Sequence, residues 1–174
     1  MLVSPRCRIL AASALALFAA PLHAQATTVS ATFQVTLTVL KVCSVTAGSG
    51  SNIVLGTQPA TATNVLGSNT ISVTCTKTTP YFIGLSPSNN STTGAGILSG
   101  ATGGNTDTIA YKLSSTAGSS GTVWGNTATS TAVGNGVAGT GTGSAQSLTV
   151  YVTVPAMNYT PDNYSDTVTV NVNY

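Results

Sequence analysis

One uninterrupted stretch, residues 27–46, constrains the fold more than any other part of the chain. It reads TTVSATFQVTLTVLKVCSVT and contains no Gly, Pro, Asn or Asp to mark a turn. Apolar and polar residues alternate along most of it, which on a β-strand gives one apolar and one polar face. The apolar face consists of Val29, Ala31, Phe33, Val35, Leu37 and Val39. The sequence therefore predicts a long β-strand with one apolar face.

The length of this stretch is too great for it to lie within one domain. Its twenty residues would span roughly 66 Å when extended, whereas a domain of the remaining size has a diameter of about 40 Å. We therefore expect residues 28–39 to project and residues 40–46 to pack within the domain. A free strand with an apolar face aggregates unless a groove receives it. Donation of the strand to a neighbouring subunit, called donor-strand complementation, is one known solution.

The first 26 residues have the pattern of a secretory signal peptide. Arg6 and Arg8 precede an apolar run over residues 9–20, and residues 24–26 read AQA, as at a cleavage site. The apolar run is too short to span a membrane. We predict cleavage after residue 26, with residue 24 as the second choice, and export of the remaining chain without a membrane anchor.

The charges that remain after the leader argue against nucleic-acid binding. Residues 27–174 contain no Arg and no His, and their formal net charge is zero. Nucleic-acid binding requires a basic surface, so this class of function is excluded. The charged residues are Lys41, Lys77, Lys112, Asp107, Asp162 and Asp166.

The same residues offer little for catalysis or cofactor binding. Without an imidazole, neither a Ser/His/Asp nor a Cys/His arrangement can form. Asp162 and Asp166 lie in a Pro/Asn turn, which favours turn roles over acid–base chemistry, and Asp107 is expected to form an Asx turn before a strand. Residues 134–139 match GxGxxG, but no helix can follow them. We predict no catalytic residues, no cofactor and no metal, and the chain is not expected to be an enzyme.

The composition of residues 27–174 favours a single all-β domain. Thr, Ser, Gly, Asn and Val dominate, and short apolar strands recur between turn-forming segments. Loops are expected at 57–67 and 88–105, and the Gly-rich segment 126–145 gives no prediction. Trp124 with Tyr111 or Tyr151 is either a sugar-stacking platform or a set of core aromatics. Strands are predicted at 52–56, 69–77, 81–85, 108–114, 147–154 and 164–174, with short ones near 97–98 and at 122–125.

Two cysteines, Cys43 and Cys75, remain in the exported chain. In an oxidising compartment a disulfide is the expected state, in preference to two free thiols or a metal site. Closing the intervening loop would contribute about 3.5 kcal/mol through chain entropy. The predicted disulfide would also bring the strand at 40–46 close to the strand at 69–77.

Four segments together resemble the spore coat protein U domain family, the Csu-type subunits of archaic chaperone–usher pili. They are residues 28–43 ending in Cys43, ISVTC at 71–75, AYKL at 110–113 and YSDTVTV at 164–170. The resemblance implies an incomplete immunoglobulin-like β-sandwich that lacks its final strand. It also implies an N-terminal donor strand at 27–39, a pilin domain at 40–174 and a disulfide between Cys43 and Cys75.

The resemblance further implies how such a chain assembles. A periplasmic chaperone fills the groove left by the missing strand, and the donor strand of the next subunit replaces it at an outer-membrane usher. The donor residues are the six apolar residues of 29–39 named above. The implied product is an extracellular pilus, or fimbria, on the bacterial surface that supports adhesion or biofilm formation. The edge of the acceptor groove is formed by Val168, Val170, Val172 and Tyr174.

One alternative is a monomeric secreted binding module. In this interpretation the long first strand folds back and complements its own domain. A ligand pocket around Trp124 would favour the alternative, as would stability without a chaperone.

Overall fold

A computed structural model describes residues 27–174. The predicted signal peptide at 1–26 lies outside the described residues. Residues 27–37 belong to a unit separate from Thr38–Tyr174, and the two are described in turn.

The N-terminal segment has no regular secondary structure, and its apolar side chains face solvent. The exposed fraction is 93% for Val29, 87% for Phe33 and 88% for Leu37. The strand predicted over 27–46 is therefore present only as β1, Cys43–Thr46. A strand is defined by hydrogen bonds to a neighbour, and residues 27–42 pair with no strand in the described part of the chain.

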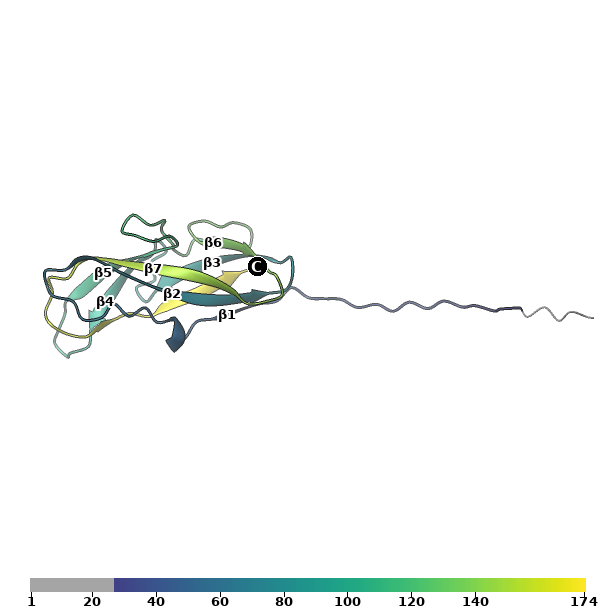
Figure 1. The fold of residues 1–174 in the computed structure, drawn as a ribbon, viewed down its shortest axis with the longest axis horizontal. Coiled ribbons are helices and arrows are strands. Elements are labelled where there is room, and N and C mark those ends of the chain that lie inside the picture. Colours follow the sequence, from purple (N-terminus) through teal and green to yellow (C-terminus); the bar gives the residue numbers. More distant parts are fainter. Residues whose placement is uncertain (1–26) are drawn as a thin grey trace, which may run out of the picture. The chain divides into compact units, whose positions relative to one another are not determined.

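Residues 38–174 form two packed antiparallel sheets, as predicted for an immunoglobulin-like sandwich (Figure 1). The larger sheet has the order β1-β2-β7-β5-β4-β8, and the smaller one has the order β6-β3-β9. One short 3-10 helix, Ser49–Ser51, follows β1. The remaining strands are β2 (Thr63–Cys75), β3 (Pro80–Pro87), β4 (Ala95–Gly100), β5 (Thr108–Ser114), β6 (Val137–Thr140), β7 (Gln146–Ala156), β8 (Tyr164–Ser165) and β9 (Val168–Asn173).

Most predicted strands are confirmed, and four predictions are corrected. No strand forms at 52–56, the segment 122–125 contributes a single bridge, Ser114↔Val123, and β2 begins at Thr63, inside the predicted loop. The predicted last strand is split into β8 and β9, which pair with different sheets. The split was hidden because the alternation of side chains continues through Asp166.

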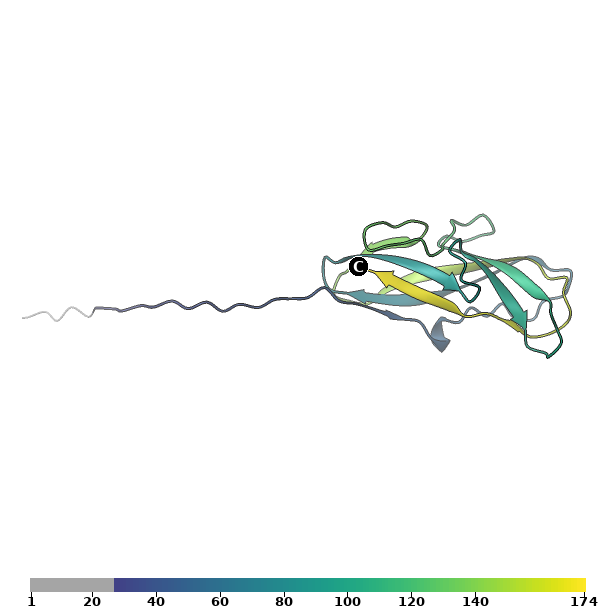
Figure 2. The same cartoon turned by 180° about the vertical axis from the view of Figure 1, so that it is seen from behind.

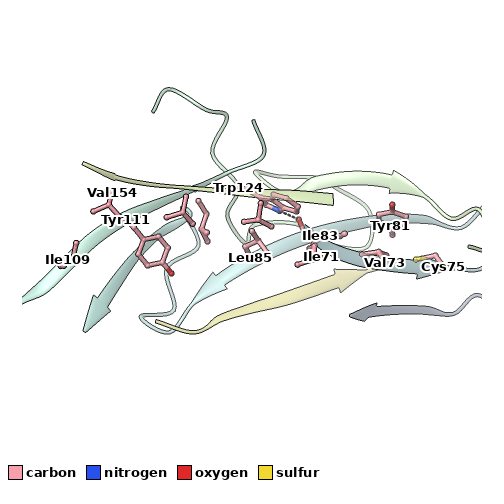
Figure 3. Packing of buried hydrophobic residues seen from close by; sticks show 13 residues of the cluster. Ile71, Val73, Cys75, Tyr81, Ile83, Leu85, Ile109, Tyr111, Trp124 and Val154 are labelled. Carbon is pink, nitrogen blue, oxygen red and sulfur yellow. Dashed lines mark hydrogen bonds between the residues drawn. The ribbon is translucent and has the colours of Figure 1, made fainter. Parts of the chain in front are cut away.

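Trp124 lies in the core between the two sheets. It is 1% exposed, and its indole Nε1 donates a hydrogen bond to the carbonyl oxygen of Ile83 at 2.8 Å (Figure 3). Buried indoles usually find such a partner. A side chain this deeply buried offers no face to a sugar, so the core-aromatic interpretation is correct.

The predicted disulfide is confirmed and ties β1 to β2. Cys43 and Cys75 are directly opposite across these antiparallel strands, with an S–S distance of 2.01 Å and a Cα–Cα distance of 4.1 Å. Hydrogen bonds continue the attachment towards the N-terminus. Thr76 Oγ1 donates to the Leu40 carbonyl at 3.2 Å, and the Thr76 N–H donates to the Val42 carbonyl at 2.9 Å. The chain is thus anchored to the sandwich from Leu40 onwards.

Candidate functional site

The candidate site begins with an open strand edge. β9 pairs with β3 on one side, and β1 pairs with β2 on one side, so each ends its sheet. Both strands lie on the same side of the sandwich, as the two opposite views show (Figures 1 and 2). Across residues 38–174, no strand joins the two sheets there. The unpaired N–H and C=O groups of an edge strand are ready to pair with an added strand.

An apolar groove of about 340 Å³ lies between these edges. Its floor is the core itself, because buried residues of both sheets line it. Residues from β9 form one wall, and residues that follow β1 form the other. The apolar lining residues are Ile53, Leu55, Ile71, Leu85, Leu98, Leu113, Val150, Val152, Val168 and Val170.

The second wall is an irregular segment that sequence reasoning missed as part of the site. Ile53 and Leu55 pack over Gly67 of β2, where an added Cβ would lie 2.8 Å from Ile53 Cγ2 and 2.6 Å from Leu55 Cδ2. Asn69 Nδ2 holds the start of the segment by donating to the Asn52 carbonyl at 2.7 Å. The alternation of Ile53 and Leu55 was the available signal. It indicated a strand, but side-chain packing rather than a hydrogen-bonded ladder places these residues.

The predicted acceptor residues divide into two pairs. Val168 and Val170 pack against the core and line the groove. Val172 also packs against the core, at the other end of β9, but it is not part of the groove lining. Tyr174 follows β9 and is 49% exposed.

One end of the groove is polar. Asp166, between β8 and β9, lines the groove together with Tyr111. The Tyr111 hydroxyl donates a hydrogen bond to Asp166 Oδ2 at 2.7 Å. Burial, together with the neighbouring carboxylate, raises the pKa of Tyr111 well above its ordinary value. Tyr111 therefore remains a neutral phenol that can donate this hydrogen bond at neutral pH.

The other two carboxylates organise the loops at the same end of the sandwich. Asp162 accepts hydrogen bonds from Asn105 Nδ2 at 2.8 Å and from the Thr102 N–H at 2.9 Å, which hold its pKa well below the ordinary range. Asp162 therefore does more than form the predicted turn, because these hydrogen bonds connect it to residues 57 and 60 positions earlier in the chain. Asp107 does not form the predicted Asx turn; it accepts hydrogen bonds from the Thr160 hydroxyl and N–H. These contacts lower the pKa of Asp107.

The predicted donor residues and the groove remain separate elements. Residues 29–37 belong to the N-terminal unit and are exposed, while the groove belongs to the sandwich. Insertion of the donor residues into the groove of another subunit stays a prediction. Within residues 27–174, no group of three or more side chains could hold a metal ion, and no helix is long and apolar enough to cross a membrane.

Comparison with known proteins finds similar solved structures and a matching family. The matched structures include the CsuC–CsuE chaperone–tip adhesion subunit pre-assembly complex from archaic chaperone-usher Csu pili of Acinetobacter baumannii, at 21% identity and a TM-score of 0.49. The match covers 79% of this chain and 41% of that chain, so this chain spans less than half the length of that relative. No curated protein sequence matches. The Spore Coat Protein U domain matches residues 29–171. Because this match covers most of the chain, the protein belongs to the Spore Coat Protein U domain family.

Proposed function

We propose that this protein is a structural subunit of an extracellular pilus, assembled by the chaperone–usher pathway through donor-strand complementation. The observation that carries the proposal is that one chain combines an open groove beside β9 with an exposed, alternating apolar segment at its N-terminus. Family membership supports the same function. In this account the donor segment of one subunit fills the groove of the next.

The spacing of the two elements supports the fit. Every second residue of a strand points to the same face, so neighbouring donor side chains repeat at about 6.6 Å. The core-facing valines of β9 have the same two-residue spacing. An inserted strand can therefore pair with the β9 backbone while its apolar residues enter the core.

The energetics favour a persistent contact. Burying five or six apolar side chains contributes about 10 kcal/mol before the cost of ordering the strand. Backbone pairing along β9 adds to this, because the edge N–H and C=O groups gain partners. The expected filament contact dissociates very slowly.

Several partners follow from the proposal. A periplasmic chaperone covers the groove before assembly, an outer-membrane usher directs the exchange, and neighbouring subunits provide the final strand. The assembled pilus lies on the bacterial surface and supports adhesion or biofilm formation. The binding-module alternative gains no support, because Trp124 is enclosed by the core.

A self-complemented chain tests the proposal. Residues 28–39 are removed from the N-terminus and attached after Tyr174 through a short flexible linker, so that each subunit fills its own groove. The expected product is a monomer that needs no chaperone and unfolds at a higher temperature than the chain lacking 28–39. A matched control carries Val35→Asp in the moved segment. Equal unfolding temperatures for the self-complemented chain and its control would contradict the proposal.

A further inference from the structure

The few charges of the sandwich are divided between its two ends. β2 and β7 pair from Thr63↔Ala156 at one end to Val73↔Gln146 at the other. Lys77 follows β2 at the Val73 end, and Lys41 lies at the same end because Thr76 binds both of its neighbours, Leu40 and Val42. We call these two exposed lysines the basic end.

The carboxylates lie at the opposite end. Asp107 immediately precedes β5. The register between β5 and β7 places Thr108, the first residue of β5, beyond Ala156, the last residue of β7. Ser99 of β4 pairs with both Thr108 and Ser165, so Asp166 lies at this end as well. Asp162 is joined to the loop after β4 by its hydrogen bonds. We call Asp107, Asp162 and Asp166 the acidic end; the opposite views show β4 and β5 far from β1 (Figures 1 and 2).

The sixth charged residue, Lys112, binds a loop close to it in the chain. Lys112 Nζ donates to the carbonyl oxygens of Ser119 at 2.9 Å and Gly121 at 3.3 Å, which ties a loop to β5. By contrast, the hydrogen-bond donors to Asp162 and Asp107 are neutral hydroxyl, amide and backbone groups. The acidic end therefore keeps a negative field at neutral pH.

The length of the chain requires two assembled domains to touch. The last donor residue, Val39, is followed at once by Leu40, which is already hydrogen-bonded to Thr76 of its own sandwich. One residue spans only about 3.3 Å, so no linker separates a donated strand from the domain that donates it. The basic end of that domain must therefore lie against one end of the acceptor groove.

The two ends of the groove differ in charge, and this decides which of them the donor domain meets. At the Val168 end of β9, the groove is lined by Asp166. At the other end of β9, Asn173 pairs with Phe82 near the start of β3, and the acceptor's own Lys77 lies in the turn between β2 and β3 at this same end. A donor domain placed there would bring like charges together, whereas at the Val168 end its lysines meet carboxylates.

We infer that the acidic end of one subunit is a docking surface for the basic end of the next copy, with Lys41 and Lys77 facing Asp107, Asp162 and Asp166. This inference rests on the proposed function and adds a second contact to it, outside the groove. The donated strand then runs antiparallel to β9. The opposite charges increase the rate at which two subunits meet, and they determine from which end the donated strand enters the groove.

The test measures how fast the full-length protein forms SDS-resistant oligomers when released from its chaperone, at about 20 mM and about 500 mM NaCl. The wild-type rate should fall about tenfold at the higher salt concentration. The K41Q/K77Q variant should be about tenfold slower at low salt and lose the salt dependence. The S130E/A132E variant changes the net charge equally at exposed positions of the loop that Asn135 and Gly125 join to Thr92 and Leu85, and it should keep the salt dependence.

A charge exchange completes the test. The K41E/K77E variant should assemble slowly, because two glutamates then face the three carboxylates. Adding T106K and N163K at exposed positions beside the carboxylates reduces the charge of the acidic end from −3 to −1 and should restore part of the rate. If oligomers form at one rate in every variant and at both salt concentrations, the docking inference is wrong while the proposed function stands. If the wild-type protein forms no oligomers at all, the proposed function and the inference both fail.

Discussion

At the scale of single residues, Tyr111 connects the core to the groove. It lies directly opposite Gly96 across β4 and β5, and an added Cβ at Gly96 would overlap its ring. The same ring carries the hydroxyl that binds Asp166. A missing side chain on β4 therefore allows an aromatic side chain of β5 to reach the acidic end of the groove.

Replacing Gly96 should be costly. Gly96→Ala displaces the Tyr111 ring and should lower the free energy of unfolding by about 1–3 kcal/mol. Gly103→Ala is the matched control, because nothing lies within 4 Å of its Cβ position. Urea unfolding of the self-complemented chain measures both. Equal effects of the two substitutions would show that the ring does not need this space.

Asp162 should make the free energy of unfolding depend on pH. Its hydrogen bonds, first from Asn105 and then from Thr102, depress its pKa in the folded state. A depressed pKa stabilises the fold above the unfolded value, near 3.9, and this stabilisation is lost as the pH falls through the folded value. Urea midpoints should therefore fall below about pH 4. The Asp162→Asn variant should show a shallower decline, and an unchanged slope would assign the effect to other carboxylates.

At the scale of elements, the alternation of apolar and polar residues predicted which side chains face the core better than it predicted which segments pair as strands. It correctly identified the core-facing valines of β9. It also predicted strands at 52–56 and over residues 27–42, where no neighbouring strand forms a ladder with the backbone. A pattern of side chains records which face is apolar, whereas a strand also requires a partner for its backbone, and that partner is set by the tertiary fold.

The short strand β6 shows that a strand can also form where the sequence has no alternation to predict it. Its sequence, VAGT, lies in a Gly-rich segment without periodicity, so no strand was predicted there. In the fold, Gly139 pairs with Tyr81, and the tyrosine ring occupies the space that a side chain at Gly139 would fill. The strand is thus stabilised by a residue almost 60 positions earlier, which local sequence reasoning cannot supply.

The two faces of the donor segment should respond differently to charge. Val35→Asp places a carboxylate on the face that enters the groove, where burying an unpaired charge costs several kcal/mol. Thr36→Asp changes the next residue, on the polar face. SDS-resistant oligomers should disappear in the first variant and persist in the second. Loss of oligomers in both, or in neither, would contradict a face-specific insertion.

The disulfide should hold β1 against β2. The double variant Cys43→Ala/Cys75→Ala should lose about 3.5 kcal/mol of unfolding free energy, as expected for a loop of this length. A reducing agent should produce a similar loss in the wild-type protein and none in the double variant. Denaturant titration of the self-complemented chain measures the difference; a loss below about 1 kcal/mol would mean that β1 is held mainly by its other contacts.

At the scale of the whole molecule, the sandwich is defined by an edge that its own described strands leave open. The sequence predicted this incomplete fold through family resemblance, and the two-sheet topology agrees with it. The extent of the groove could not be predicted, because the irregular wall at Ile53 and Leu55 depends on packing against Gly67. The separation of charges between the ends was also hidden, because Asp107, Asp162 and Asp166 come to one end only through the pairing of β4 with β5 and β8 and the hydrogen bonds of the loop after β4.

The central claim is that residues 27–39 join one subunit to the next. The most direct measurement is the size distribution of the protein expressed in the periplasm with its chaperone, with and without these residues. The full-length chain should give a ladder of SDS-resistant oligomers, and the chain lacking 27–39 should remain in a one-to-one complex with the chaperone. Two stable, chaperone-free monomers would contradict strand donation and favour the self-contained binding module.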